Sequence, residues 1–361
     1  MNSEDDLFGQ AAGYAAQFQQ SLGERRVGAE ASFDEVRAAL GGPLPDEGSE
    51  DAVVLRELIA GAEPGIVGSQ TGRYFGFVFG SALPAAVAAD WVATAWDQNG
   101  FSVVSSPAAA AAEAVAAEWI AELLGLPSEV SSGFVTGAQA ANTTGLAAAR
   151  HHVLAAAGWD VERDGLAGAP PLRVIAGGER HVTIDRSLRL LGIGTNAVVA
   201  VPVDRQGRMD AAAVRAELAR QERASIVCAQ AGNVNTGAFD PVAELADACA
   251  PARAWLHVDG AFGLWAAASP KLRRLVEGVG RADSWATDAH KWLNVPYDCG
   301  LVYCRHEEAH ARSMAVAATT RGPSRTGSGR RRAGGSSRRR PSTVRAPPRA
   351  GNRRDHSRTG R

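Results

Sequence analysis

Residues 224–263 read ASIVCAQAGNVNTGAFDPVAELADACAPARAWLHVDGAFG. Two apolar runs, 224–229 and 254–258, are expected to be strands, and the segment 241–250 between them has the spacing of a helix. A strand, a helix and a second strand in this order form the unit from which parallel sheets are built. The alternation extends over residues 107–304 and predicts an α/β domain with a mainly parallel sheet and helices on both faces. Further strands are expected at 172–176, 197–203, 284–287 and 300–304, and further helices at 107–124, 138–157 and 210–221.

Three parts of the chain differ in composition. Residues 1–70 are expected to form a helical segment, with amphipathic stretches at 5–22 and 50–60, and residues 71–316 form the predicted large domain. Residues 317–361 hold 14 Arg and one acid and lack apolar periodicity, which predicts a disordered Arg-rich tail. The remaining chain has a net charge of −14, which argues against nucleic acid as a ligand.

The cysteines and the N-terminus indicate the cellular compartment in which the protein is expected. Cys228, Cys249, Cys299 and Cys304 form no CxxC pair and no metal-ligand cluster, so we expect reduced thiols, no metal and a cytoplasmic protein. The acidic start of the chain lacks the apolar core of a signal peptide. No apolar run reaches the roughly 20 residues that cross a bilayer, so no membrane association is expected.

Lysine is rare in this chain, because only Lys271 and Lys291 occur against 36 Arg. Arginine serves where only a positive charge is needed, but it cannot lose its proton to become a nucleophilic amine. Lys271 lies in the polar stretch SPKLRR, whereas Lys291 lies in WATDAHKWLNVPYD between His290 and Trp292. Apolar and aromatic surroundings favour the neutral amine that a Schiff-base lysine needs. Lys291 is therefore the candidate nucleophile.

Asp259 ends an apolar strand in the stretch LHVDGAFG. A buried carboxylate is costly without a partner, and the protonated ring nitrogen of a heteroaromatic cofactor would be one. Gly260 and Ala261 are small enough for such a ring to approach the backbone. The alternative is an Asp that caps the next helix.

The stretch GFVTGAQAANTTGLAAAR, residues 133–150, places a glycine turn before a long helix. Free backbone N–H groups at a helix start suit a phosphate group, and Gly137, Ala138 and Gln139 would supply them. An ordinary helix start has the same pattern, so this signal is weak by itself.

Two further segments follow expected strands. His181, in GERHVTID, could stack on a cofactor ring and exchange protons there, although a lone histidine is more often packed or solvated. Asn235 and Thr236, in the polar loop 229–241, could hydrogen-bond a phenolic oxygen of the cofactor.

The motifs TGAQAAN, His181, GNVNTGAFD, HVDGAFG and DAHKW occur in one order. This set resembles the fold-type I enzymes that use pyridoxal 5′-phosphate (PLP), and most closely the group II amino-acid decarboxylases. The resemblance covers about residues 50–316 and includes RYFGFVFGSALPAA near its start. It implies that Lys291 forms a Schiff base with PLP, that Asp259 pairs with the ring nitrogen, that His181 stacks on the ring, that Ala261 packs beneath it and that His290 contacts cofactor or substrate.

The implied reaction is decarboxylation of an L-amino acid to the amine by a homodimer. A carbon–carbon lyase or aldolase on the same fold is one alternative, and an inactive PLP-binding fragment is another. Two departures stand out. Asp288 lies where relatives acting on aromatic substrates have an Asn facing the phosphate, and an acid there would repel that group. The tail does not resemble the family's small C-terminal domain, so we expect that domain to be missing.

Overall fold

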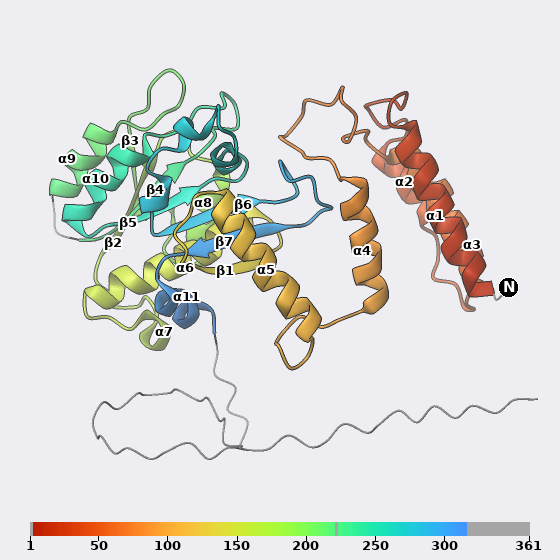
Figure 1. The fold of residues 1–361 in the computed structure, drawn as a ribbon, viewed down its shortest axis with the longest axis horizontal. Coiled ribbons are helices and arrows are strands. Elements are labelled where there is room, and N and C mark those ends of the chain that lie inside the picture. Colours follow the sequence, from red (N-terminus) through yellow and green to blue (C-terminus); the bar gives the residue numbers. More distant parts are fainter. Residues whose placement is uncertain (1–2, 221–222, 316–361) are drawn as a thin grey trace, which may run out of the picture. The chain divides into compact units, whose positions relative to one another are not determined.

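The structure, a computed structural model, describes residues 3–220 and 223–315 (Figure 1). The described residues form one sheet with the strand order β1-β7-β6-β5-β4-β2-β3. The predicted tail, 317–361, lies outside the described residues, so its disorder stays a prediction. The strands are β1 (Ser131–Val135), β2 (Leu172–Gly177), β3 (Val198–Val201), β4 (Ala224–Gln230), β5 (Trp255–Asp259), β6 (Ser284–Asp288) and β7 (Gly300–Cys304).

Most of the sheet is parallel, as predicted. Strands β3, β2, β4, β5 and β6 run in one direction, and β7 lies antiparallel between β6 and β1. Strand β1 was not expected, because its sequence, SSGFV, is short, polar at its start and interrupted by Gly133. Its pairing with β7, where Gly133 faces Val302, makes it a strand, and this is a tertiary contact that local sequence does not report.

Helices cover both faces of the sheet, because alternate strand residues point to opposite sides. Val174 and Ile226 pack in a core with α6, α8 and α11, whereas Ile175 and Val227 pack in a second core with α5, α9 and α10 (Figure 1). These helices are α5 (Pro107–Leu123), α6 (Ala138–Ala156), α8 (Val182–Leu190), α9 (Ala211–Arg220), α10 (Val242–Ala252) and α11 (Glu307–Met314), and the short α7 (Val161–Asp164) follows α6.

The N-terminal part is helical, as predicted, but it has more helices than the two expected ones. The expected pair is α1 (Ser3–Ser21) and α3 (Asp51–Ala62). The added α2 (Phe33–Leu40) begins at a capping box, in which Glu35 N–H donates to Ser32 Oγ at 3.3 Å and the Glu35 carboxylate accepts from Ser32 N–H at 2.7 Å. Beyond residue 70 the structure adds another unexpected helix, α4 (Pro84–Trp96), which has a proline at its first turn, where no N–H is needed.

The described part of the chain lacks membrane-spanning helices, metal-binding groups and disulfide bonds. None of its helices is long and apolar enough to cross a membrane, and no group of three or more His, Cys, Asp or Glu there could hold a metal ion. All four cysteines are free, and Cys228, Cys249 and Cys304 are buried. Burial raises the pKa of the Cys249 thiol to about 12, so this side chain stays protonated at neutral pH.

The topology brings several strand ends to one edge of the sheet. The carboxyl ends of parallel β4, β5 and β6 lie there, and β1 ends at the same edge because it is antiparallel to β7, which is itself antiparallel to β6. Helix α6 begins directly after β1, so its N-terminus also lies at this edge. Ligands of open α/β sheets gather at such an edge.

Candidate active site

Lys291 follows the carboxyl end of β6 by three residues. Its Nζ lies 2.9 Å from Asp288 Oδ2, and its side chain is about one fifth exposed. A cavity of about 350 Å³ opens beside it, lined by Lys291, Trp292 and residues of the 69–81 segment. A Cβ at Gly80 would collide with the main-chain oxygens of His290 and Lys291, so this segment runs directly against the lysine. Lys291 is thus a half-buried amine facing a cavity.

Asp259 ends β5 and is buried. Its Oδ2 accepts from Asn142 Nδ2 at 3.1 Å, and its Oδ1 accepts from the Ala261 N–H at 3.2 Å. Burial raises the pKa of Asp259, and the nearby positive charges of His181 and Lys291 oppose that rise. Thr183 Oγ1 lies 3.5 Å from Asp259 Oδ2 and 2.9 Å from His181 Nδ1, so His181 is close to Asp259. The Asp288 N–H, three residues before Lys291, donates to the Ala261 carbonyl at 2.9 Å.

The start of α6 lies against the end of β6. Gly137, with φ of 89°, precedes the helix, and the Ala138 N–H donates to Asp288 Oδ1 at 2.5 Å. This helix end therefore already holds a negative charge, as the helix dipole favours. Gln139 turns its side chain toward α8, where Nε2 donates to Ser187 Oγ at 2.9 Å. Only the backbone of Gln139 is then free to contribute to a phosphate site.

The two candidate histidines are His181, at the start of α8, and His290, directly before Lys291. His181 caps α8, its Nδ1 lies 2.9 Å from Thr183 Oγ1, and its N–H donates to Gln230 Oε1 at 3.1 Å. His290 Nδ1 accepts the Cys299 N–H at 3.0 Å, so the proton of the neutral ring sits on Nε2. Burial lowers the pKa of His290, although the carboxylate of Asp288 opposes this. A neutral His290 can donate from Nε2.

The loop after β4 is arranged differently from the expectation for Asn235 and Thr236. Both residues are exposed, and Thr236 Oγ1 donates to the Gln206 carbonyl at 2.7 Å. Asn233 Oδ1 accepts the N–H groups of Asn235 and Thr236, which folds the loop on itself. Within residues 3–220 and 223–315, no hydrogen bond or ion pair joins Thr236 to Lys291. Its role as a cofactor ligand stays a prediction.

Sequence reasoning missed three residues that the fold adds to this region. Asn142 is fully buried and holds Asp259, and its only signal was a polar residue inside an alanine-rich helix. Gln70 and Thr71 line the cavity beside Lys291. Gln70 Oε1 and Thr71 Oγ1 are buried and have no hydrogen-bond partner among the described residues. Buried oxygens of this kind are expected to meet a ligand or water.

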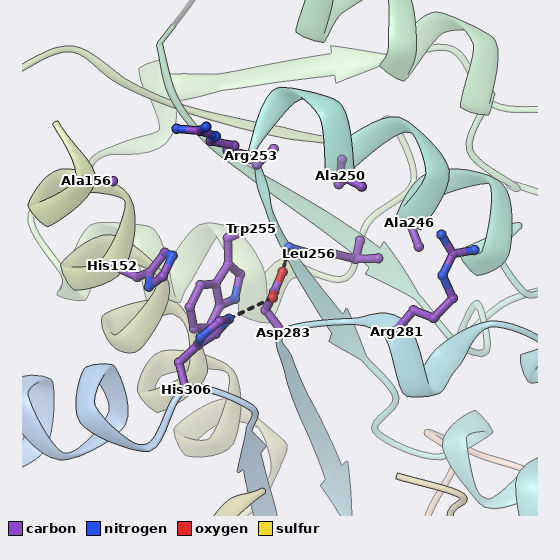
Figure 2. A pocket seen from close by; sticks show the side chains of 12 residues that line it. His152, Ala156, Ala246, Ala250, Arg253, Trp255, Leu256, Arg281, Asp283 and His306 are labelled. Atoms are coloured by element: carbon purple, nitrogen blue, oxygen red, sulfur yellow. Dashed lines mark hydrogen bonds and ion pairs between the residues drawn. The ribbon is translucent and has the colours of Figure 1, made fainter. Parts of the chain in front are cut away.

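A second cavity, of about 400 Å³, lies at the opposite edge of the sheet, where β5 and β6 begin. Figure 2 shows the side chains of His306 and Asp283 in contact next to Trp255. His306 Nε2 lies 2.9 Å from Asp283 Oδ1. His152 stacks near His306, with ring centroids 4.6 Å apart. None of the sequence-predicted site residues lines this cavity, so the candidate active site is the cavity beside Lys291.

Comparisons with known proteins agree with this geometry. The pyridoxal-dependent decarboxylase conserved domain matches residues 44–319. An aromatic-L-amino-acid decarboxylase of Bacillus atrophaeus is 29% identical over 76% of this chain and 56% of its own length. Tryptophan decarboxylase 1 of Oryza sativa subsp. japonica is 31% identical over 75% of this chain and 55% of its own. The chain thus spans about half the length of these relatives.

Solved structures show the same fold. The Oryza sativa TDC structure with PLP and tryptamine superposes with a TM-score of 0.79 at 27% identity, over 88% of this chain and 67% of that one. The mouse CSAD structure gives a TM-score of 0.78 at 25% identity, over 87% and 65% of the two chains. From the matched domain and these likenesses, the chain belongs to the pyridoxal-dependent decarboxylase family, whose cofactor is pyridoxal 5′-phosphate.

Proposed function

We propose that this chain binds PLP covalently through Lys291 and catalyses the decarboxylation of an L-amino acid to its amine. The observation that carries the proposal is that Asp259 and Asp288 end neighbouring parallel strands at one sheet edge, where Asp288 contacts both Lys291 and the start of α6. An amine, a buried acid and a helix N-terminus are the three groups that match an aldehyde, a protonated ring nitrogen and a phosphate.

The residues at this edge fit the cofactor on two further grounds. Gln70 and Thr71 line the same cavity as Lys291, and each has a buried side-chain oxygen with no hydrogen-bond partner among the described residues, as expected where a polar ligand or water binds. The carboxylate of Asp259 is held by neutral donors from Asn142 and Ala261. A cationic ring nitrogen would therefore give this buried acid the direct ion pair that it lacks among the described residues.

When bound, PLP supplies an aldehyde that captures amines and a pyridinium ring that accepts electrons from the substrate. Lys291 is the amine that would hold PLP through its aldehyde carbon, and Asp288, 2.9 Å away, would hold the Lys291 amine when the substrate amine takes its place. Asp259 would keep the ring nitrogen protonated, while the Nε2–H of His290 or the ring of His181 would return a proton to the carbon that has lost CO₂.

Release of CO₂ from a panel of L-amino acids tests this function. CO₂ with an equal amount of amine would support decarboxylation. Carbonyl products without CO₂ would favour the carbon–carbon lyase or aldolase. PLP bound on Lys291 without any product would identify an inactive PLP-binding fragment.

We further propose that the chain acts as a homodimer. The segment from Phe75 to Val104 exposes Phe75, Phe77, Trp96, Phe101 and Val104, each by more than 60%. Apolar side chains gathered in one segment at this exposure are typical of a protein interface. Sedimentation velocity should give twice the chain mass, and a monomer at micromolar concentration would overturn this proposal.

The free thiols agree with the expected cytoplasmic location, which stays a prediction.

A further inference from the structure

Asp288 is fixed on the start of α6 by both its side chain and its main chain. It is 2% exposed, with Oδ1 on the Ala138 N–H at 2.5 Å and Oδ2 on Lys291 Nζ at 2.9 Å. Its N–H donates to the Ala261 carbonyl at 2.9 Å, and its own carbonyl accepts from Trp265 Nε1 at 2.9 Å. Hydrogen bonds thus hold the main chain of Asp288 on both sides, while its carboxylate contacts both α6 and Lys291.

The amide that Asp288 holds is one that the cofactor phosphate would use. A helix N-terminus carries only about half a positive charge, which cannot neutralise a carboxylate and a phosphate together. Two negative groups that share one backbone amide repel each other, and this repulsion is stronger near a protein interior than in water. An ionised Asp288 beside Ala138 therefore opposes a phosphate there.

We propose that Asp288 is a positioning residue that acts as a charge gate on the cofactor site. It orders Lys291 and the start of α6 through the contacts above, and it weakens the binding of a phosphate-bearing cofactor, so that PLP stays exchangeable. This inference rests on the proposed function, in which PLP binds at Lys291. It goes beyond that function because Asp288, although it lies at the cofactor site, would weaken the binding of PLP.

The test compares PLP with pyridoxal, which has the same aldehyde and ring but no phosphate. Cofactor-depleted full chain is titrated with each compound, and visible absorbance gives the two dissociation constants. The variants are Asp288→Asn and Asp288→Ser, which both remove the charge. Asp298→Asn is the matched control, because it removes the same charge from an exposed position ten residues further along the chain.

Loss of the Lys291 ion pair affects both compounds alike, so the ratio of the two affinities isolates the phosphate. We expect the preference for PLP over pyridoxal to rise at least about tenfold in both Asp288 variants and to stay unchanged in Asp298→Asn. PLP bound on Lys291 with an unchanged or lower preference in the variants would overturn the charge gate alone. Failure of the parent chain to bind either compound at Lys291 would overturn the proposed function and this inference with it. Circular dichroism checks that each variant folds. If only one of the two neutral variants folds, that variant alone is enough to test the charge gate.

Discussion

Asn142 Nδ2 donates to Asp259 Oδ2 at 3.1 Å and thereby joins helix α6 to the end of β5. The hydrogen bonds continue from Asn142 to His257, Ser284 and Trp255. Asn142 Oδ1 lies 2.9 Å from His257 Nε2, so that nitrogen carries the proton, and His257 Nδ1 accepts from Ser284 Oγ at 2.8 Å. Trp255 Nε1 donates to the same Ser284 oxygen. The acid proposed to face the ring nitrogen is thus oriented by a neutral, buried network.

Asn142→Leu tests this network. The substitution removes the buried amide that contacts Asp259 Oδ2 and His257 Nε2, while Asp259 keeps the Ala261 N–H and His257 keeps Ser284 Oγ. The free energy of unfolding should therefore fall by about 1–3 kcal/mol for each group. Urea denaturation of the purified chain measures it. Asn235→Leu is the matched control, because Asn235 is exposed and its side chain holds no buried group. Equal stability of the two variants would show that the network contributes little.

Lys291 should be the site of cofactor attachment. Borohydride reduction of the PLP-loaded chain should leave one pyridoxyl group, which peptide mass mapping should place on Lys291. The remaining lysine, Lys271, is exposed and serves as an internal control. Lys291→Ala should abolish the adduct, while Lys271→Ala should retain it. A reduced adduct on Lys271 would contradict the site.

Asp259→Ala should keep some cofactor through Lys291 and the α6 start, yet lose CO₂ release by at least about a hundredfold. The reason is that a buried charge pair with the ring nitrogen contributes about 3–5 kcal/mol when one partner is removed. Initial rates at saturating PLP measure the loss, and the visible spectrum reports retained cofactor. Turnover close to that of the parent would rule out the role of Asp259 at the ring.

Gly80→Ala should damage the cavity beside Lys291. The added methyl group would collide with the main chain of His290 and Lys291, which cannot yield as a flexible side chain can. We expect lower thermal stability and weaker PLP binding. Gly72→Ala is the control, since a Cβ at Gly72 meets nothing within 4 Å. Similar PLP affinities for the two variants would mean that the 69–81 segment does not pack on the lysine.

The stability of the chain should fall in mild acid because of His257. Burial lowers the pKa of His257 to about 3, from an ordinary value of 6.5. Below pH 6.5 the unfolded chain binds a proton that the folded chain does not, so stability is full above 6.5 and is lost as the pH falls toward 3. The loss is about 1.4 kcal/mol per pH unit at most.

Urea denaturation at pH values between 7.5 and 5 measures this slope. His257→Gln lacks the titrating group, so its unfolding free energy should depend on pH less steeply, by up to one proton. Equal slopes for the parent and His257→Gln would contradict the buried neutral imidazole.

Asp288 was singled out only through the resemblance to the family. The sequence by itself determined the α/β class, the mostly parallel sheet and the candidate residues Lys291 and Asp259. These follow from local signals: apolar runs that alternate with helical spacing, a lysine in a chain that otherwise uses arginine, and an acid at a strand end. The apolar runs and the acid at the strand end are visible within about ten residues and the scarcity of lysine is visible in the composition, so no tertiary information is needed to find them.

Only the tertiary structure decided how those residues meet. Strand β1 exists through its pairing with β7, and that pairing places the start of α6 beside Asp288. The partner of Asp259 is Asn142, 117 residues away in sequence. Thr236 fits the motif but is exposed and bonded to Gln206, because its loop folds back on itself. Contacts between distant segments depend on the packing of the whole sheet, and no local pattern encodes them.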